Sequence, residues 1–335
     1  MGQETDKAQS RPPKAGLIAE YLGVALVLGA LVLVFSVTTE NFFTYTTFRT
    51  SANQMPAAVI IAVGMTFVLI IAGIDLSVGS VVALSGAALG VCMAKLHLPL
   101  PAAVAACLAV GLLCGAVNGL VTVRWALPSF IVTLGMMEVA RGGAYLITDS
   151  RTNYIGRSIA GIAKTSVFGL SLPFLLAVAI VAAGQLVLSG TSFGRRMVAI
   201  GANEEAARLS GIDTRRVKLT VFAICGFLAA LAAVITVSRM EAADPNAGSG
   251  YELQAIAAVV VGGTSLMGGR GSVVGSFFGA LIIAVLAAGL AQIGAQEPTK
   301  RLITGLVIVL AVILDHYRHR LERPRKSRDG ESAKA

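Results

Sequence analysis

Charged residues are scarce in this sequence. Asp, Glu, Lys and Arg together make up 13% of its 335 residues, about half the share found in ordinary soluble domains. Hydrophobic residues account for 56%, and the mean hydropathy is +0.79. These values exclude a soluble globular protein and indicate a bundle of membrane helices. Any chemistry that requires a folded soluble domain therefore has to come from a partner protein.

Cysteine and histidine are too few and too scattered to build a metal site or a catalytic centre. The four cysteines all lie inside apolar stretches and lack the short paired spacing of zinc ligands. One of the three histidines lies in a short loop, and the other two lie among arginines near the carboxyl end. No Gly-x-Ser-x-Gly elbow has a histidine to serve it, and His-Glu-x-x-His does not occur. We therefore expect no enzymatic activity and no cofactor or metal.

A phosphate-binding loop is missing as well. The glycine-rich stretch at 268–272 has no lysine before its hydroxyl residue and adjoins an apolar run, unlike the motif Gly-x-x-x-x-Gly-Lys-Ser/Thr. The chain by itself is therefore not expected to hydrolyse ATP. Its net charge of +9 is concentrated at the ends and in one central segment. Membrane topology accounts for that distribution, so we expect no nucleic-acid partner.

What the sequence does contain is a series of long apolar stretches. They predict ten transmembrane helices, near residues 17–37, 53–72, 78–95, 101–122, 127–148, 167–189, 218–237, 251–266, 272–293 and 300–315. The expected fold class is therefore all-α, a polytopic membrane helix bundle embedded in lipid. Glycines repeated every four residues, as in Gly111, Gly115 and Gly119, predict close packing between some of these helices.

The distribution of basic residues predicts the orientation. If the amino terminus is cytosolic, 18 of the 27 Lys and Arg residues lie on the cytosolic side, as the positive-inside rule requires. We therefore expect both termini in the cytosol. The predicted domains are a polar cytosolic tail at 1–16, a transmembrane domain at 17–315 and a basic cytosolic tail at 316–335.

Two apolar stretches are interrupted by glycine-rich segments, at residues 73–80 and 262–272, and both segments lead into Gly-Ser-Val-Val. Interrupted hydrophobic segments at corresponding positions in two halves of a chain are typical of a transport pathway, because the freed backbone groups must face protein or water. The alternative is an ordinary turn in which Asp75 or Ser77 caps the next helix.

Several polar residues lie within or beside the apolar stretches and are candidates to line a pathway. Glu138 and Arg141 are three residues apart, hence on one helix face, where they could either neutralise each other or line the pathway. Asp75 lies in the first interrupted segment. Asn118 and Gln254 are weaker candidates, because a single amide in a membrane helix often serves only as a contact between helices.

The segment at 191–218 is the longest polar stretch between two predicted crossings, and we expect it in the cytosol. Asn203 is a suitable cap for a short helix, Glu204 and Glu205 fall in its first turn, and Gly211 is suited to end it. Such an exposed helix has too little apolar surface to fold as a domain but enough to dock into a groove on another protein. The alternative is a solvated loop.

This segment also resembles a known motif. Glu205-Ala206-Ala207 followed after three residues by Gly211 is similar to the coupling motif of bacterial ABC importer permeases. In that family the helix inserts into a cleft of an ATPase subunit, so the resemblance implies that residues 203–211 dock there. The Ile-x-Leu-Pro half of the general motif is absent, and Val-Phe-Ala-Ile stands at 221–224 in its place.

Three longer stretches, at 62–80, 192–212 and 250–271, resemble the permeases of ribose-type monosaccharide ABC importers. Permeases for branched-chain amino acids and nucleosides share the broader fold and remain alternatives. The resemblance implies an inner-membrane permease that pairs with a second permease subunit, identical or different, with a cytosolic ATPase and with a periplasmic sugar-binding protein. It does not identify residues that contact the sugar. An ion-coupled secondary transporter, using Glu138 or Asp75 as the ion site, is the competing interpretation.

Overall fold

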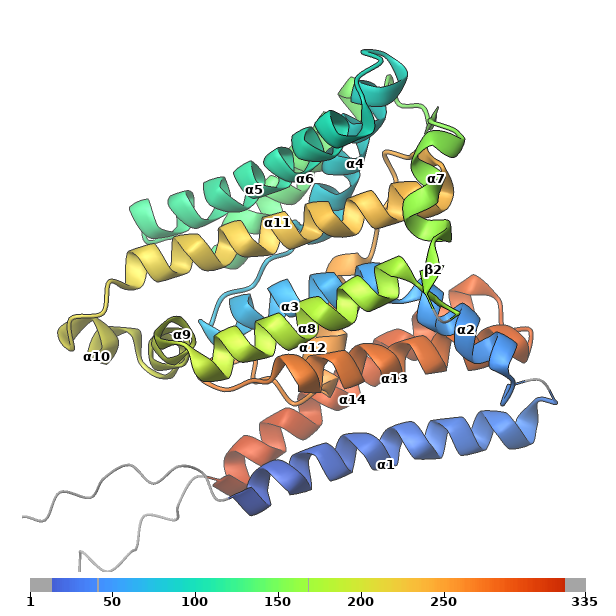
Figure 1. Ribbon diagram of the computed structural model, residues 1–335. Coiled ribbons are helices and arrows are strands. Elements are labelled where there is room, and N and C mark those ends of the chain that lie inside the picture. Colours follow the sequence, from blue (N-terminus) through green and yellow to red (C-terminus); the bar gives the residue numbers. More distant parts are fainter. Residues whose placement is uncertain (1–13, 41, 168, 323–335) are drawn as a thin grey trace, which may run out of the picture.

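A bundle of helices forms the described part of the chain, as the computed structural model shows for residues 14–40, 42–167 and 169–322 (Figure 1). The predicted amino-terminal tail at 1–16 lies almost wholly outside the described residues, and so does most of the predicted basic tail at 316–335.

Within the described ranges, each predicted apolar stretch coincides with a helix. These helices are α1 (Lys14–Thr38), α3 (Pro56–Ile70), α4 (Val78–Ala94), α5 (Leu100–Arg124), α6 (Ser129–Ile147), α8 (Leu172–Gly190), α11 (Thr214–Met240), α12 (Tyr251–Val261), α13 (Val273–Gln292) and α14 (Glu297–Glu322). Shorter helices lie between them, namely α2 (Tyr45–Gln54), α7 (Arg157–Lys164), α9 (Ser192–Ala202) and α10 (Glu204–Leu209). The chain is therefore predominantly helical, as predicted.

Not every one of these helices is long enough to cross a membrane alone. Among the described residues, α5, α6, α8, α11 and α13 have the length and hydropathy of a span, and α2 with α3 forms a sixth candidate that is bent by 49°. The helices beside the two glycine-rich interruptions are shorter, with 17 residues in α4 and 11 in α12. The fold is thus a polytopic membrane-type bundle with five or six candidate spans, and ten crossings remain a prediction.

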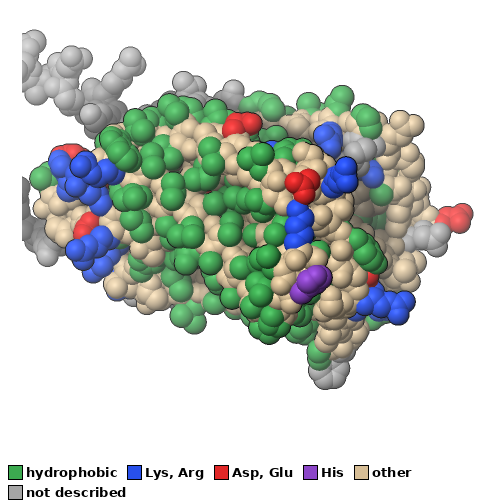
Figure 2. Space-filling model, turned by 90° about the horizontal axis from the view of Figure 1, so that it is seen from above, with side chains coloured by type: hydrophobic (Ala, Val, Ile, Leu, Met, Phe, Trp, Pro, Cys, Tyr) green, Lys and Arg blue, Asp and Glu red, His purple; other side chains and the backbone are tan. Residues whose placement is uncertain are grey.

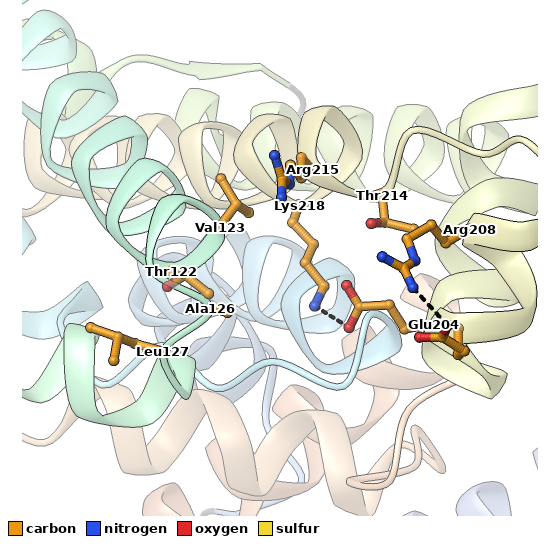
Figure 3. Close-up of a pocket in the computed structure, with 10 residues that line it drawn as sticks. Thr122, Val123, Ala126, Leu127, Glu204, Arg208, Thr214, Arg215 and Lys218 are labelled. Atoms are coloured by element: carbon orange, nitrogen blue, oxygen red, sulfur yellow. Dashed lines mark hydrogen bonds and ion pairs between the residues drawn. The ribbon is translucent and has the colours of Figure 1, made fainter.

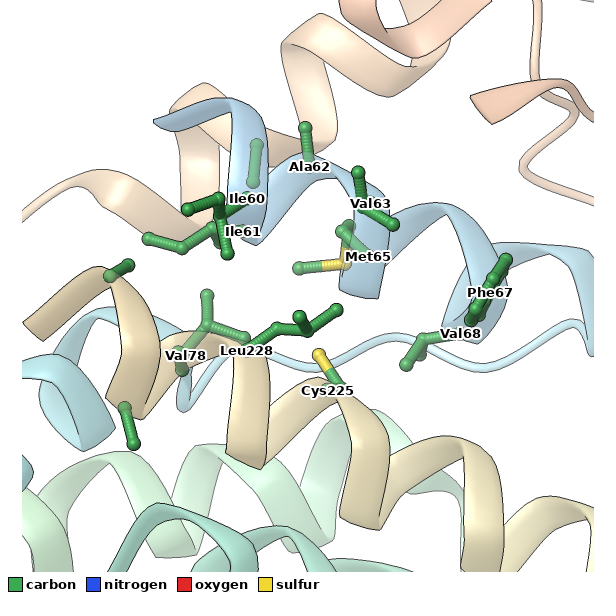
Figure 4. Packing of buried hydrophobic residues seen from close by; sticks show 14 of the residues in the cluster. Ile60, Ile61, Ala62, Val63, Met65, Phe67, Val68, Val78, Cys225 and Leu228 are labelled. Atoms are coloured by element: carbon green, nitrogen blue, oxygen red, sulfur yellow. The ribbon is translucent and has the colours of Figure 1, made fainter. Parts of the chain in front are cut away.

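Helix α11 forms the centre of the bundle. In its apolar window 72% of the residues are buried, and it packs against α3, α4 and α5. Figure 4 shows the contact with α3, where Met65 faces Cys225 and Leu228. Contact with α5 depends on glycine, because a Cβ on Gly115 would lie 2.2 Å from the carbonyl oxygen of Phe222. The close packing predicted from the glycine spacing is confirmed here.

The outer helices expose much of their apolar surface. Only 17% of the apolar window of α6 is buried, and 28% of that of α5 and of α8. Figure 2 shows one such face, where hydrophobic side chains cover the middle and basic side chains gather towards the two ends. An apolar band between charged ends is the surface expected of a protein in a bilayer.

The two ends of the bundle differ. At one end lie α9, α10, the start of α1 and the end of α14 (Figure 1). At the other lie α7 and short antiparallel strands, in which β1 (Asn153–Tyr154) pairs with β4 (Ala242–Ala243) and β2 (Ser166–Val167) with β3 (Leu170–Ser171). The described ends of the chain therefore share one side with the segment at 191–218.

Candidate coupling segment and translocation pathway

The predicted docking helix is present as α10 and has the predicted ends. The Asn203 side chain accepts a hydrogen bond from the backbone N–H of Ala206, at 3.0 Å. Gly211 has a φ of +83° and donates its N–H to the Arg208 carbonyl, while Ile212 donates to the Ala207 carbonyl. This is the Schellman arrangement that ends many helices at a glycine. Cap and stop are thus confirmed.

Helix α10 is attached to the bundle by few contacts. Ala207 is buried, whereas Glu205 and Ala206 are exposed and Leu209 is 79% exposed. Glu204 turns back towards α11, where its Oε2 lies 2.5 Å from Lys218 Nζ (Figure 3). Glu205 pairs within the helix with Arg208, at 2.7 Å. The helix therefore presents an outer face that carries the Glu205–Arg208 ion pair and the apolar Leu209, while a second ion pair ties it to α11.

Helix α9 connects α10 to the end of α3, just before the first interrupted segment, and to the second interrupted segment. A Cβ on Gly201, near the end of α9, would lie 1.8 Å from the carbonyl oxygen of Ile70, the last residue of α3. The same carbonyl accepts the N–H of Gly269, from the second interrupted segment, at 2.9 Å. Gly269 in turn lies against Ala202, since a Cβ added to Gly269 would be 2.9 Å from the Cα of Ala202. The segment at 191–218 thus contacts the second interruption and the residue at which α3 ends, three residues before the first interruption begins at Gly73.

Hydroxyl groups of α6 form hydrogen bonds with the backbone of the first interrupted segment. The Ile74 N–H donates to Ser129 Oγ at 2.9 Å, and the Leu76 N–H donates to Thr133 Oγ1 at 3.1 Å. Thr133 Oγ1 also donates to the Ile74 carbonyl. These two side chains, four residues apart on α6, replace the partners that a helix would supply inside a bilayer. Sequence reasoning missed this pair, although their spacing just after Pro128 was visible.

Asp75 and Asn118 lie inside the bundle near the start of α4. Asp75 Oδ1 accepts hydrogen bonds from the backbone N–H and the hydroxyl of Ser77, at 2.9 and 2.6 Å. Asn118 Nδ2 donates to Ser77 Oγ at 2.9 Å, while its buried Oδ1 has no hydrogen-bond partner among the described residues. Neither Asp75 nor Ser77 makes a side-chain capping bond to α4. The predicted capping of α4 by Asp75 or Ser77 is therefore wrong.

Glu138 and Arg141 do not pair. The Arg141 guanidinium donates from Nη1 to the carbonyls of Pro245 and Ala247, at 2.7 and 3.0 Å. Among the described residues no ion pair or hydrogen bond engages the Glu138 side chain, which is exposed. The predicted mutual neutralisation is therefore wrong, because the turn before α12 offers Arg141 two free carbonyls. Gln254 is exposed in the first turns of α12.

Comparison with known proteins decides the family. The family described as "Branched-chain amino acid transport system / permease component" matches residues 47–312. The chain is 40% identical over 306 residues to the ribose import permease protein RbsC of Haemophilus influenzae, covering 90% of this chain and 94% of that protein. The RbsC protein of Escherichia coli is 39% identical, and the match covers 90% of this chain and 95% of that protein. The xylose transport system permease protein XylH of E. coli is 36% identical, and the match covers 90% of this chain and 93% of that protein.

The chain belongs to this family of transport permeases. The relatives are permease components of ABC importers, so the chain is a transport component of that kind. The recognition made from residues 62–80, 192–212 and 250–271 is confirmed.

In this permease a cavity of about 330 Å³ separates α10 from the bundle (Figure 3). Val123 at the end of α5 and Ala126 and Leu127 in the turn that follows form an apolar wall, and Arg215 and Lys218 line the side of α11. A smaller cavity of about 140 Å³ adjoins it and reaches Gly73, in the first interruption. Helix α10 is therefore not packed tightly against the membrane helices, which leaves it room to move.

Proposed function

We propose that the permease is the membrane-spanning subunit of an ATP-driven importer and conducts a monosaccharide delivered by a binding protein. The observation that carries this proposal is the position of α9 and α10. An exposed, capped helix, whose outer face carries the Glu205–Arg208 ion pair and Leu209, is joined through Gly201 to the end of α3 and to the second interrupted segment. Relatives named for ribose and xylose, covering 90% of the chain, favour a sugar as the substrate.

The proposed topology has ten crossings within residues 17–315, both termini in the cytosol, and a bacterial inner membrane as its location. Support comes from the helix found in each predicted stretch and from the excess of basic residues on one side. The start of α1 and the end of α14 lie at the same end of the bundle as α10 (Figure 1).

The partners we propose are a second permease subunit, a cytosolic ATPase and a periplasmic sugar-binding protein. The ATPase would hold the element at 203–211, in which Asn203, Glu204, Glu205, Ala206, Ala207 and Gly211 form the docking helix and its ends, with Glu205 and Ala206 exposed to the partner. ATP binding would then move α10, and α9 would transmit the movement to the two interruptions, so that the pathway opens to one side at a time.

The pathway we propose contains two kinds of polar residue. Asp75 lies in the first interruption and Asn118 lies beside it on α5, and both bind Ser77 and so fix the shape of that segment. Glu138 and Gln254 are exposed on α6 and α12, and Arg141 holds the turn that precedes α12. Because affinity is supplied by the binding protein, such a pathway needs only weak contacts with sugar hydroxyls.

Reconstitution tests this function. The permease would be placed in proteoliposomes with its ATPase and binding protein, and uptake of labelled ribose, xylose, leucine and a nucleoside would be compared with and without ATP. We expect ATP-dependent uptake of a pentose. Uptake of leucine or the nucleoside alone would favour the wider branch of the family named in the matching description. Uptake driven by an imposed proton or sodium gradient without ATP would refute the proposal.

A further inference from the structure

Glu138 occupies an unusual place for a charged residue. It lies in the middle of α6, which runs from Ser129 to Ile147 and has the length and hydropathy of a membrane span. Its side chain is exposed in the single chain, and no other described side chain pairs with it. Neighbouring Val139 is 69% exposed.

A carboxylate at this depth is costly in lipid. Ionisable residues within membrane helices almost always face the bundle interior or a water-filled cavity. The face of α6 that carries Glu138 is not covered by the rest of the described chain, since Gly135, Glu138 and Gly142 are all exposed. The Glu138 carboxylate therefore requires water beside it, while the apolar side chains exposed elsewhere on α6, such as Leu146, suit the bilayer.

Space beside Glu138 supports the same conclusion. Gly135 lies one turn before it and Gly142 one turn after it, on the same helical face. At both positions nothing lies within 4 Å of an added Cβ. By contrast, a Cβ on Gly143 would lie 3.2 Å from Leu84. The Glu138 carboxylate is thus flanked by two glycines, each with open space where a side chain would lie.

The nearest cation on the same helix is directed elsewhere. Arg141 donates to the carbonyls of Pro245 and Ala247 in the turn before α12. The charge that remains exposed at the centre of α6 is therefore negative.

We propose that Glu138 is a specificity-determining residue that faces the aqueous pathway and disfavours anionic solutes relative to neutral sugars. This inference rests on the proposed function. A carboxylate accepts hydrogen bonds from the hydroxyls of a neutral sugar, whereas it repels a sugar acid or a sugar phosphate, the more strongly where the walls are apolar. Such a filter would let a neutral monosaccharide enter while opposing the loss of phosphorylated sugars from the cell.

The test uses cysteine reporters and two water-soluble thiol reagents of opposite charge. Gly135→Cys and Gly142→Cys are suitable, because the added side chain meets no neighbour. Reaction rates with a cationic and an anionic methanethiosulfonate would be measured on the assembled transporter, after subtracting the reaction of the native cysteines. We expect the ratio of cationic to anionic rates to fall about tenfold when Glu138→Gln is added.

Asp149→Asn is the matched control, since it also removes one carboxylate but lies beyond the end of α6 and pairs with Lys95. It should leave the ratio at Gly135→Cys unchanged. If Glu138→Gln left the ratio of cationic to anionic reaction rates unchanged, or if Asp149→Asn lowered it equally, the proposed charge selectivity would be refuted. Reporters that react with neither reagent would overturn the aqueous placement, even if ATP-dependent pentose uptake persisted. Loss of pentose uptake by the unsubstituted complex would instead refute the proposed function, and the reagent ratio would still be measurable.

Discussion

Lys218 Nζ lies 2.5 Å from Glu204 Oε2 and so joins the first turns of α11 to the first residue of α10. The lysine side chain is 20% exposed and the glutamate side chain 48%. Because α10 otherwise touches the bundle mainly through the buried Ala207, this ion pair is a principal side-chain connection between the proposed docking helix and the central helix.

Removing the Lys218 charge should uncouple the two helices. A partly exposed ion pair contributes only about 0–1 kcal/mol to folding, so Lys218→Gln should barely change the melting temperature. We expect the sugar-stimulated ATPase rate of the assembled transporter to fall several-fold, because α10 no longer moves with α11. The exchange Glu204→Lys with Lys218→Glu should restore much of that rate. A normal rate in Lys218→Gln would show that the pair transmits nothing.

Gly201→Ala tests the close contact between α9 and the end of α3. Its methyl group would lie 1.8 Å from the Ile70 carbonyl oxygen, so α9 or the end of α3 must shift. We expect a loss of stability of about 1–3 kcal/mol, measured by thermal unfolding in detergent, together with loss of ATP-dependent uptake. Gly161→Ala in α7 is the control, because nothing lies within 4 Å there. If Gly201→Ala and Gly161→Ala were equally stable, the close contact of Gly201 with the Ile70 carbonyl would be contradicted.

Thr133→Val should destabilise the first interruption. Removing the hydroxyl leaves the Leu76 N–H and the Ile74 carbonyl without the partners they have now, and an unsatisfied buried group costs about 1–3 kcal/mol. Thr133→Ser keeps the hydroxyl and should retain most of the stability. Unfolding midpoints of the two variants in the same detergent would decide, and a stable Thr133→Val would mean that water replaces the hydroxyl.

Acid should weaken the opposite end of the bundle. Lys164 holds the pKa of Glu241 below its ordinary value of 4.5 through a hydrogen bond and its charge. A carboxylate with a lowered pKa stabilises the fold fully above that ordinary value, and this contribution is lost as the pH falls through the lowered pKa. Glu241→Gln should therefore lower the melting temperature at pH 7 and match the unsubstituted protein once the pH has fallen below the lowered pKa of Glu241. A difference that persists in acid would exclude the ion pair as its cause.

Local chemistry made much of the permease predictable. Helix positions followed from apolar stretches, and both ends of α10 followed from Asn203 and Gly211, because a cap and a glycine stop act within a few residues. Both interruptions were visible as glycine-rich segments. In each case the cause lies close in sequence to the effect.

Long-range partners were not predictable in the same way. Arg141 binds carbonyls at 245 and 247, about a hundred positions away, and nothing near Arg141 indicates that this turn lies beside it. Pairing it with Glu138 was the natural choice from helical spacing, yet the strongest acceptors came from another part of the chain. The hydroxyls of Ser129 and Thr133 escaped notice because their partners are backbone groups, which leave no mark in the sequence.

Helix α11 runs unbroken over 27 residues, so it is about 40 Å long. It is tied to α10 at its start by Lys218 and to α7 at its end by Glu241. Because α11 has no break between Lys218 and Glu241, tilting the helix at one end also displaces its other end. Under the proposed docking, a pull on α10 would therefore displace the far end of α11, where Glu241 pairs with Lys164, as well as the near end.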